Sequence, residues 1–175
     1  MNGTIIAQGS GYNQIPRPHR MLIVNDIIIY EESNSRGLRF TVLENVEVIH
    51  DQVYDTFGSS VRADALAADI GLVTGNRAGV LTSFDAWESS ITPELRTAFM
   101  AFNLRVAAQP TSEYRRPYAA IFTSTNAIED IQNTEADSLP AIVRQSFQKS
   151  IVIPLLLVGT VISAVLFIGR RKAKL

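Results

Sequence analysis

The first third of the sequence alternates apolar runs with short polar breaks, a pattern typical of β-structure. Met21–Val24 and Ile27–Tyr30 are apolar runs, and only Asn25 and Asp26 separate them. This arrangement predicts either one long buried strand or a tight hairpin. Further along, apolar residues alternate with polar ones at Leu38, Phe40, Val42, Val46 and Val48. Residues 21–50 are therefore predicted to form β-strands.

Helical spacing of apolar residues predicts two helices in the middle of the chain, over residues 60–73 and 92–108. Thr92 suits the N-cap of the second helix, and Pro93 suits its first helical position. The apolar positions are Leu66, Ile70 and Val73 in the first helix and Leu95, Phe99, Phe102 and Val106 in the second. Such stripes are typical of faces that pack on a core.

The segment after the second helix is predicted to hold a strand, a loop and a further helix. Residues 117–125 read PYAAIFTST and predict a β-strand, whereas the polar residues 126–138 predict a loop with a short helical turn. In residues 139–150, Val143 and Phe147 are four positions apart. This spacing predicts an amphipathic juxtamembrane helix.

The N-terminal residues 1–20 contain three glycines and two prolines, which interrupt regular structure. They predict an extended arm that either wraps a neighbouring subunit or is mobile. They also lack the apolar core of a signal peptide. The predicted fold class is α+β, in which residues 21–138 form one small antiparallel sheet with two or three helices. A C-terminal transmembrane helix is predicted to follow.

The most informative segment is Ile151 to Gly169, IVIPLLLVGTVISAVLFIG, which has 19 positions and no charge. A helix of this length spans roughly 28 Å, close to the hydrocarbon thickness of about 30 Å. The alternative, a buried core helix, would normally show a polar face, and only Thr160 and Ser163 interrupt this one. Residues 151–169 are therefore predicted to span a membrane.

Three small or kinking residues stand out within the predicted span. Pro154 lies one turn from its start, where it removes a backbone donor and favours a kink. Gly159 and Ser163 are four apart, a spacing that lets two membrane helices approach closely. The alternative for this short motif is chance occurrence.

Charge divides the chain into an acidic body and a basic tail. Residues 1–149 hold 12 Lys and Arg against 17 Asp and Glu, a formal net charge of −5. The tail, residues 170–175, carries Arg170, Arg171, Lys172 and Lys174. We expect the tail to contact anionic lipid or nucleic acid weakly. A tail-anchored topology is favoured, because it moves only six residues across the bilayer, although the positive-inside rule favours the opposite orientation.

No convincing catalytic, cofactor or metal site is predicted. The chain has no cysteine, which excludes disulfides and zinc–thiolate sites. His50 and Asp51, with Asp55 nearby, are the best acid–base or metal candidates, but a metal needs three or more converging ligands. The preferred interpretation is an exposed junction between a strand and a turn.

Three residues are predicted as partner contacts. Trp87 is the only tryptophan and suits a partner anchor, with burial in the core as the alternative. Arg115 and Arg116 are adjacent and suit contact with a phosphate headgroup or an acidic partner. The alternative for the two arginines is a solvated entrance to the strand that follows.

These features together predict a membrane-anchored structural or assembly protein that is not an enzyme. Its expected partners are the lipid bilayer and protein neighbours, with no small-molecule substrate. The setting that the topology favours is a virion, in which the protein links a capsid to an internal membrane. The alternatives are an accessory single-span subunit of a cellular membrane complex and a membrane-tethered enzyme that uses His50 and Asp51.

Overall fold

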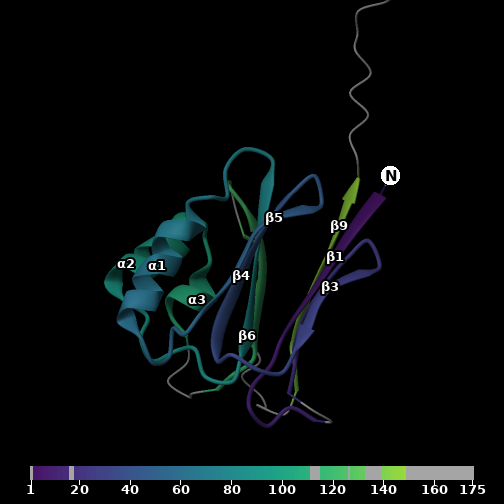
Figure 1. The fold of residues 1–175 in the computed structure, drawn as a ribbon. Coiled ribbons are helices and arrows are strands. Elements are labelled where there is room, and N and C mark those ends of the chain that lie inside the picture. The colour runs from purple at the N-terminus through teal and green to yellow at the C-terminus, as the bar shows by residue number, and fades with distance from the viewer. Residues whose placement is uncertain (1, 16–17, 111–114, 126, 133–138, 149–175) are drawn as a thin grey trace, which may run out of the picture.

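The computed structural model describes residues 2–15, 18–110, 115–125, 127–132 and 139–148. This part of the chain forms two antiparallel sheets and three helices, arranged in three layers with the helices on the outer face of one sheet (Figure 1). The predicted α+β class is confirmed, but the expectation of a single small sheet is wrong. The predicted transmembrane helix at 151–169 and the basic tail lie outside the described residues. Within them, no helix has the length and apolar character needed to cross a membrane.

The four-stranded sheet has the order β3-β2-β1-β9. Its strands are β1 (Asn2–Gly9), β2 (Arg20–Val24), β3 (Ile27–Glu32) and β9 (Ala141–Gln148). β1 lies in the interior of this sheet and pairs along its length with β9, from Asn2 opposite Gln148 to Gly9 opposite Ala141. The two ends of the described chain are therefore neighbouring strands.

The five-stranded sheet has the order β5-β4-β6-β7-β8. Its strands are β4 (Gly37–Glu44), β5 (Glu47–Tyr54), β6 (Arg77–Phe84), β7 (Tyr118–Thr123) and β8 (Ala127–Gln132). The helices are α1 (Ser60–Ile70), α2 (Pro93–Ala101) and α3 (Arg105–Ala108). This sheet is covered by helices on one face and by the four-stranded sheet on the other, which explains why β6 and β7 are almost entirely buried.

Each face of the five-stranded sheet has its own apolar core. The core between the two sheets includes Ile5, Ala7, Leu22, Val80, Ile121 and Val143. The core beneath the helices includes Phe40, Leu66, Leu81, Trp87, Phe99 and Phe122. The predicted apolar stripes of the two helices supply part of the second core, because Leu66, Ile70, Leu95 and Phe99 are fully buried.

The helix and hairpin predictions are resolved by backbone geometry. Thr92 caps α2 as predicted, since its hydroxyl accepts a hydrogen bond from the Leu95 N–H at 3.2 Å. The helix predicted over 92–108 is interrupted after Ala101, and Asn103 has a left-handed backbone with φ of 59°. At 25–26 the chain forms a hairpin and not one long strand, because Asn25 and Asp26 both have positive φ.

The predicted N-terminal arm is wrong, because residues 2–9 are strand β1. Ile5 and Ala7 point into the core between the sheets, and β1 is hydrogen-bonded on both sides. The glycines of this segment fit a strand that is closely approached by its neighbours: a Cβ on Gly9 would lie 1.8 Å from the Tyr118 carbonyl oxygen. The segment is therefore part of the folded domain.

The predicted helix at 139–150 is also wrong, because residues 141–148 are strand β9. Ala141 and Val143 are buried while Ile142 and Arg144 are exposed, which is the two-residue period of a strand. The loop predicted at 126–138 contains strand β8 in its first half. In both segments the sheet offers backbone hydrogen bonds that local spacing does not reveal.

Candidate functional site

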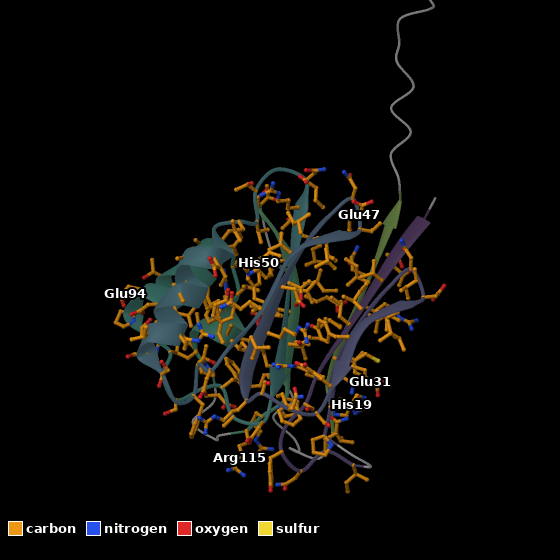
Figure 2. All side chains as sticks on the ribbon, in the orientation of Figure 1. His19, Glu31, Glu47, His50, Glu94 and Arg115 are labelled. Carbon is orange, nitrogen blue, oxygen red and sulfur yellow. The ribbon has the colours of Figure 1, made fainter. Side chains whose placement is uncertain are left out.

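Three loops meet at one end of the domain, and we call them the loop pole: residues 10–15, 85–88 and 115–116. Figure 2 shows Arg115 at this end and Glu47 at the opposite end. The Arg115 guanidinium lies 4.6 Å from the centre of the Tyr12 ring, and its Nε is 3.3 Å from Asp85 Oδ1. Arg115 and Tyr12 are each about half exposed, with 49% of the Arg115 side chain and 54% of Tyr12 accessible. They present a cation and an aromatic ring to solvent.

The buried carboxylate of Glu88 holds two of these loops together. It accepts hydrogen bonds from the backbone N–H groups of Trp87 at 2.8 Å, Arg116 at 2.8 Å and Arg115 at 3.2 Å. Burial raises the pKa of Glu88 above its ordinary value, and these N–H groups partly offset the rise. Glu88 therefore sets the position of the Arg115 backbone.

Two further features of the loop pole are typical of functional sites. Asp85 and Arg115 both have left-handed backbones, with φ of 58° and 67°. Among the described residues, the buried Ser10 Oγ and Gln14 Oε1 have no hydrogen-bond partner. Backbone strain and unpaired buried polar atoms gather at functional sites more than elsewhere. The loop pole is therefore the candidate interaction site of the described domain.

The three predicted contact residues differ in their exposure to solvent. Arg115 is exposed at the loop pole, and Arg116 is partly buried beside it. Trp87 is fully buried against Tyr118, and its indole N–H donates to the Arg116 carbonyl at 2.8 Å. Trp87 therefore shapes the loop pole from inside, and its side chain is not on the surface as a partner anchor would be. Sequence reasoning missed Tyr12, Asp85 and Glu88, which no motif distinguishes.

His50 and Asp51 lie on opposite faces of β5 and do not act together. His50 Nε2 is 3.2 Å from the Tyr54 hydroxyl, and that hydroxyl donates to Asp69. Burial, together with the hydrogen bond to Asp69, raises the pKa of Tyr54. Asp51 instead pairs with Arg39. No group of three metal-ligating side chains converges anywhere in the described residues.

Asp51 belongs to a charge network that joins the edges of the two sheets. It accepts from Arg39 and from the Thr41 hydroxyl at 2.9 Å. Arg39 also pairs with Glu32 at 2.9 Å and stacks 3.9 Å above the Tyr30 ring. The carboxylate of Asp51 raises the pKa of Arg39. This network is structural, because each charge already has a partner.

We expect Asp51→Asn to lower the free energy of unfolding by about 1 kcal/mol, because networked, partly buried ion pairs contribute on this scale. His50→Ala should have a smaller effect, since it removes one hydrogen bond and contact with Phe40. Urea denaturation of each variant measures both. Equal stability of Asp51→Asn and the parent would show that the network contributes nothing.

No protein-family model matches the chain, and comparison with curated proteins finds no match. The candidate site therefore rests on the geometry of the loop pole alone. The loop pole presents one exposed arginine, an aromatic ring and an acidic side chain, and Arg115 and Asp85 have left-handed backbones.

Proposed function

We propose that this chain is a membrane-anchored structural or assembly protein whose folded domain stands directly on the bilayer. The observation that carries the proposal is the position of β9, which stays in the sheet up to Gln148. Ile151, three positions later, begins the uncharged 19-residue segment. Three residue steps reach at most about 11 Å, so no long linker separates the two-sheet domain from the predicted span.

The same geometry gives the domain a direction. β9 runs from Ala141, opposite Gly9, to Gln148, opposite Asn2. The loop pole follows Gly9, whereas the predicted span follows Gln148 at the other end of this strand pair. An eight-residue strand is about 27 Å long. Arg115 and Tyr12 would therefore face away from the bilayer, where a protein neighbour can reach them.

The leading setting that we propose is a virion protein that links a capsid to an internal membrane. The acidic body would face the capsid, and the basic tail would face anionic lipid or nucleic acid on the other side. The alternative is an accessory single-span subunit of a cellular membrane complex. Purification with native partners distinguishes the two, because the first predicts capsid proteins and the second cellular membrane subunits.

We expect the full chain to stay with membranes in alkaline carbonate and to need detergent for release. A chain that ends at Lys149 should be soluble and folded, since the last described strand ends at Gln148. Ultracentrifugation with immunoblotting checks both outcomes. Release of the full chain by carbonate would contradict membrane anchoring.

We expect Arg115→Glu to reduce recovery of the native protein neighbour, because it reverses the exposed charge of the loop pole. Arg62→Glu is the matched control, since Arg62 is exposed on α1 and belongs to none of the three loops of the loop pole. Co-purification in detergent, measured as the ratio of partner to bait, tests the assignment. Equal loss in both variants would indicate a general charge effect and would remove the loop pole as the contact.

A further inference from the structure

The β2–β3 and β4–β5 turns lie together at the end of the domain where β9 ends, and we call residues 25–28 and 45–49 the hairpin end (Figure 1). The Asn25 N–H donates to the Thr4 carbonyl at 2.9 Å, and Thr4 pairs with Ser146 of β9. A Cβ placed on Gly3 would lie 3.1 Å from Asn25 Oδ1 and 3.5 Å from Val46 Cγ1. Both turns therefore flank the start of β1 and the end of β9.

The hairpin end gathers exposed apolar side chains. The exposed fractions are 66% for Ile27, 56% for Ile28, 45% for Ile49, 39% for Val48 and 38% for Val46. Single exposed apolar residues are ordinary on protein surfaces, but a cluster marks an interaction surface. Val46 lies in the β4–β5 turn, and the other four lie where β3 and β5 adjoin the two turns, so all five are at the same end of the domain.

Val46 gives independent evidence, because its backbone is unfavourable for its side chain. Asn45 and Val46 have φ of 51° and 67°, the left-handed conformation of a tight hairpin turn. Glycine, asparagine and aspartate adopt this conformation readily, whereas a β-branched residue is a rare outlier. The neighbouring hairpin uses Asn25 and Asp26 at the same two positions. The fold does not explain an exposed valine here.

We propose that the hairpin end contacts the lipid interface, so that the domain rests on the bilayer through these two turns. This inference builds on the proposed membrane anchor. Asn25 is level with Ser146, and five residue steps separate Ser146 from Ile151. Measured along the strand direction, the hairpin end therefore lies no more than about 18 Å from the start of the predicted span, even with the chain fully extended. A tilt of the domain toward its β3 and β5 edges would bring the two turns into the lipid headgroup region.

The charges of the hairpin end define the lipid surface that it suits. Asp26 and Glu47 are exposed at the two turns, and no basic residue lies within residues 25–28 or 45–49. Their carboxylates would remain hydrated among the headgroups while the apolar side chains enter the interface. The hairpin end is therefore suited to a zwitterionic lipid surface. Added anionic lipid should weaken the contact, because it repels the two carboxylates.

The absence of cysteine allows a direct test with the full chain. We would introduce Ile28→Cys or Val48→Cys, attach an environment-sensitive fluorophore, and place one copy in each phosphatidylcholine nanodisc. Ile15→Cys is the matched control, because Ile15 is 75% exposed at the loop pole. We expect a blue shift and quenching by headgroup nitroxide lipid at positions 28 and 48, and neither effect at position 15.

The outcomes distinguish this inference from the membrane anchor itself. Carbonate-resistant protein that shows no quenching at 28 or 48 would overturn the lipid contact and leave the anchor standing. Protein released by carbonate would overturn both. A blue shift that appears only with two copies in a nanodisc would assign the hairpin end to a second copy and overturn the lipid contact.

The variant Val46→Gly distinguishes the effect of Val46 on folding stability from its effect on the lipid contact. Glycine relieves the left-handed strain, so the variant should unfold at a higher temperature than the parent. It also removes an apolar side chain, so the blue shift at position 28 should decrease. Asp26→Gly is the matched control, which changes the same turn position without removing apolar surface. A Val46→Gly variant with undiminished shift and quenching would exclude Val46 from the contact.

Discussion

A chain that lacks residues 2–9 is expected not to fold. These residues form β1, which pairs with β2 on one side and β9 on the other. Their loss exposes two strand edges and removes Ile5 and Ala7 from the core between the sheets. The combined loss should exceed the total stability of an ordinary domain, about 5–15 kcal/mol. Circular dichroism and the dispersion of amide resonances measure the outcome.

The matched comparison is made in chains that end at Lys149, so that the predicted span does not affect solubility. The chain of residues 1–149 should unfold cooperatively, because every described strand is intact. A chain without residues 2–9 that unfolds within a few degrees of it would mean that β1 is dispensable. That result would restore the interpretation of the N-terminus as a separate arm.

Glu88→Ala is expected to lower the free energy of unfolding by about 3 kcal/mol, because each buried N–H left without an acceptor costs about 1–3 kcal/mol. Three backbone N–H groups depend on this carboxylate. The expected loss is smaller than three full costs of this kind, because Arg115 is exposed and water can reach its N–H. Urea denaturation measures the change.

The matched control is Glu31→Ala, because Glu31 is exposed on β3. It should change stability by less than about 0.5 kcal/mol. A similar loss in both variants would show that burial of Glu88 has no special role. Glu88→Gln keeps one acceptor oxygen, so its loss should lie between those of the two alanine variants.

Glu88 also gives stability a defined dependence on pH. Burial raises its pKa above 4.5 in the folded state, so the folded protein binds this proton more tightly than the unfolded chain. Its contribution to stability therefore falls as pH rises from the ordinary glutamate range through the raised folded pKa. Asp130 adds a change of the same sign, because burial raises its pKa too. Glu88→Gln should make this decline shallower.

The segment at 139–150 shows why local spacing misled. Val143 and Phe147 are four apart, which suits one face of a helix, but Ala141, Val143 and Gln145 also follow a period of two. Local sequence alone does not distinguish a helix from a strand here. The pairing of β9 with β1 favours the strand, because it gives hydrogen-bond partners to the backbone groups along the otherwise free edge of β1.

The loop pole was predictable only in part. Adjacent arginines drew attention to Arg115 and Arg116, and Arg115 is indeed exposed. Nothing local distinguishes Glu88 from other glutamates, because its role depends on N–H groups 27 and 28 residues away. The same holds for Tyr12, which meets Arg115 across more than 100 positions of sequence.

The sequence by itself determined the α+β class, the existence of the helix predicted over 60–73 and observed over 60–70, the Thr92 cap and strand β7, because capping residues and apolar period are local properties. Tertiary structure alone decided that the N-terminal segment is an interior strand, that residues 141–148 are its partner, and that Trp87 is buried. It also brought the two hairpin turns together beside the end of β9. These outcomes depend on pairing between distant segments, whose free energy comes from shared hydrogen bonds and a common core that no short stretch of sequence contains.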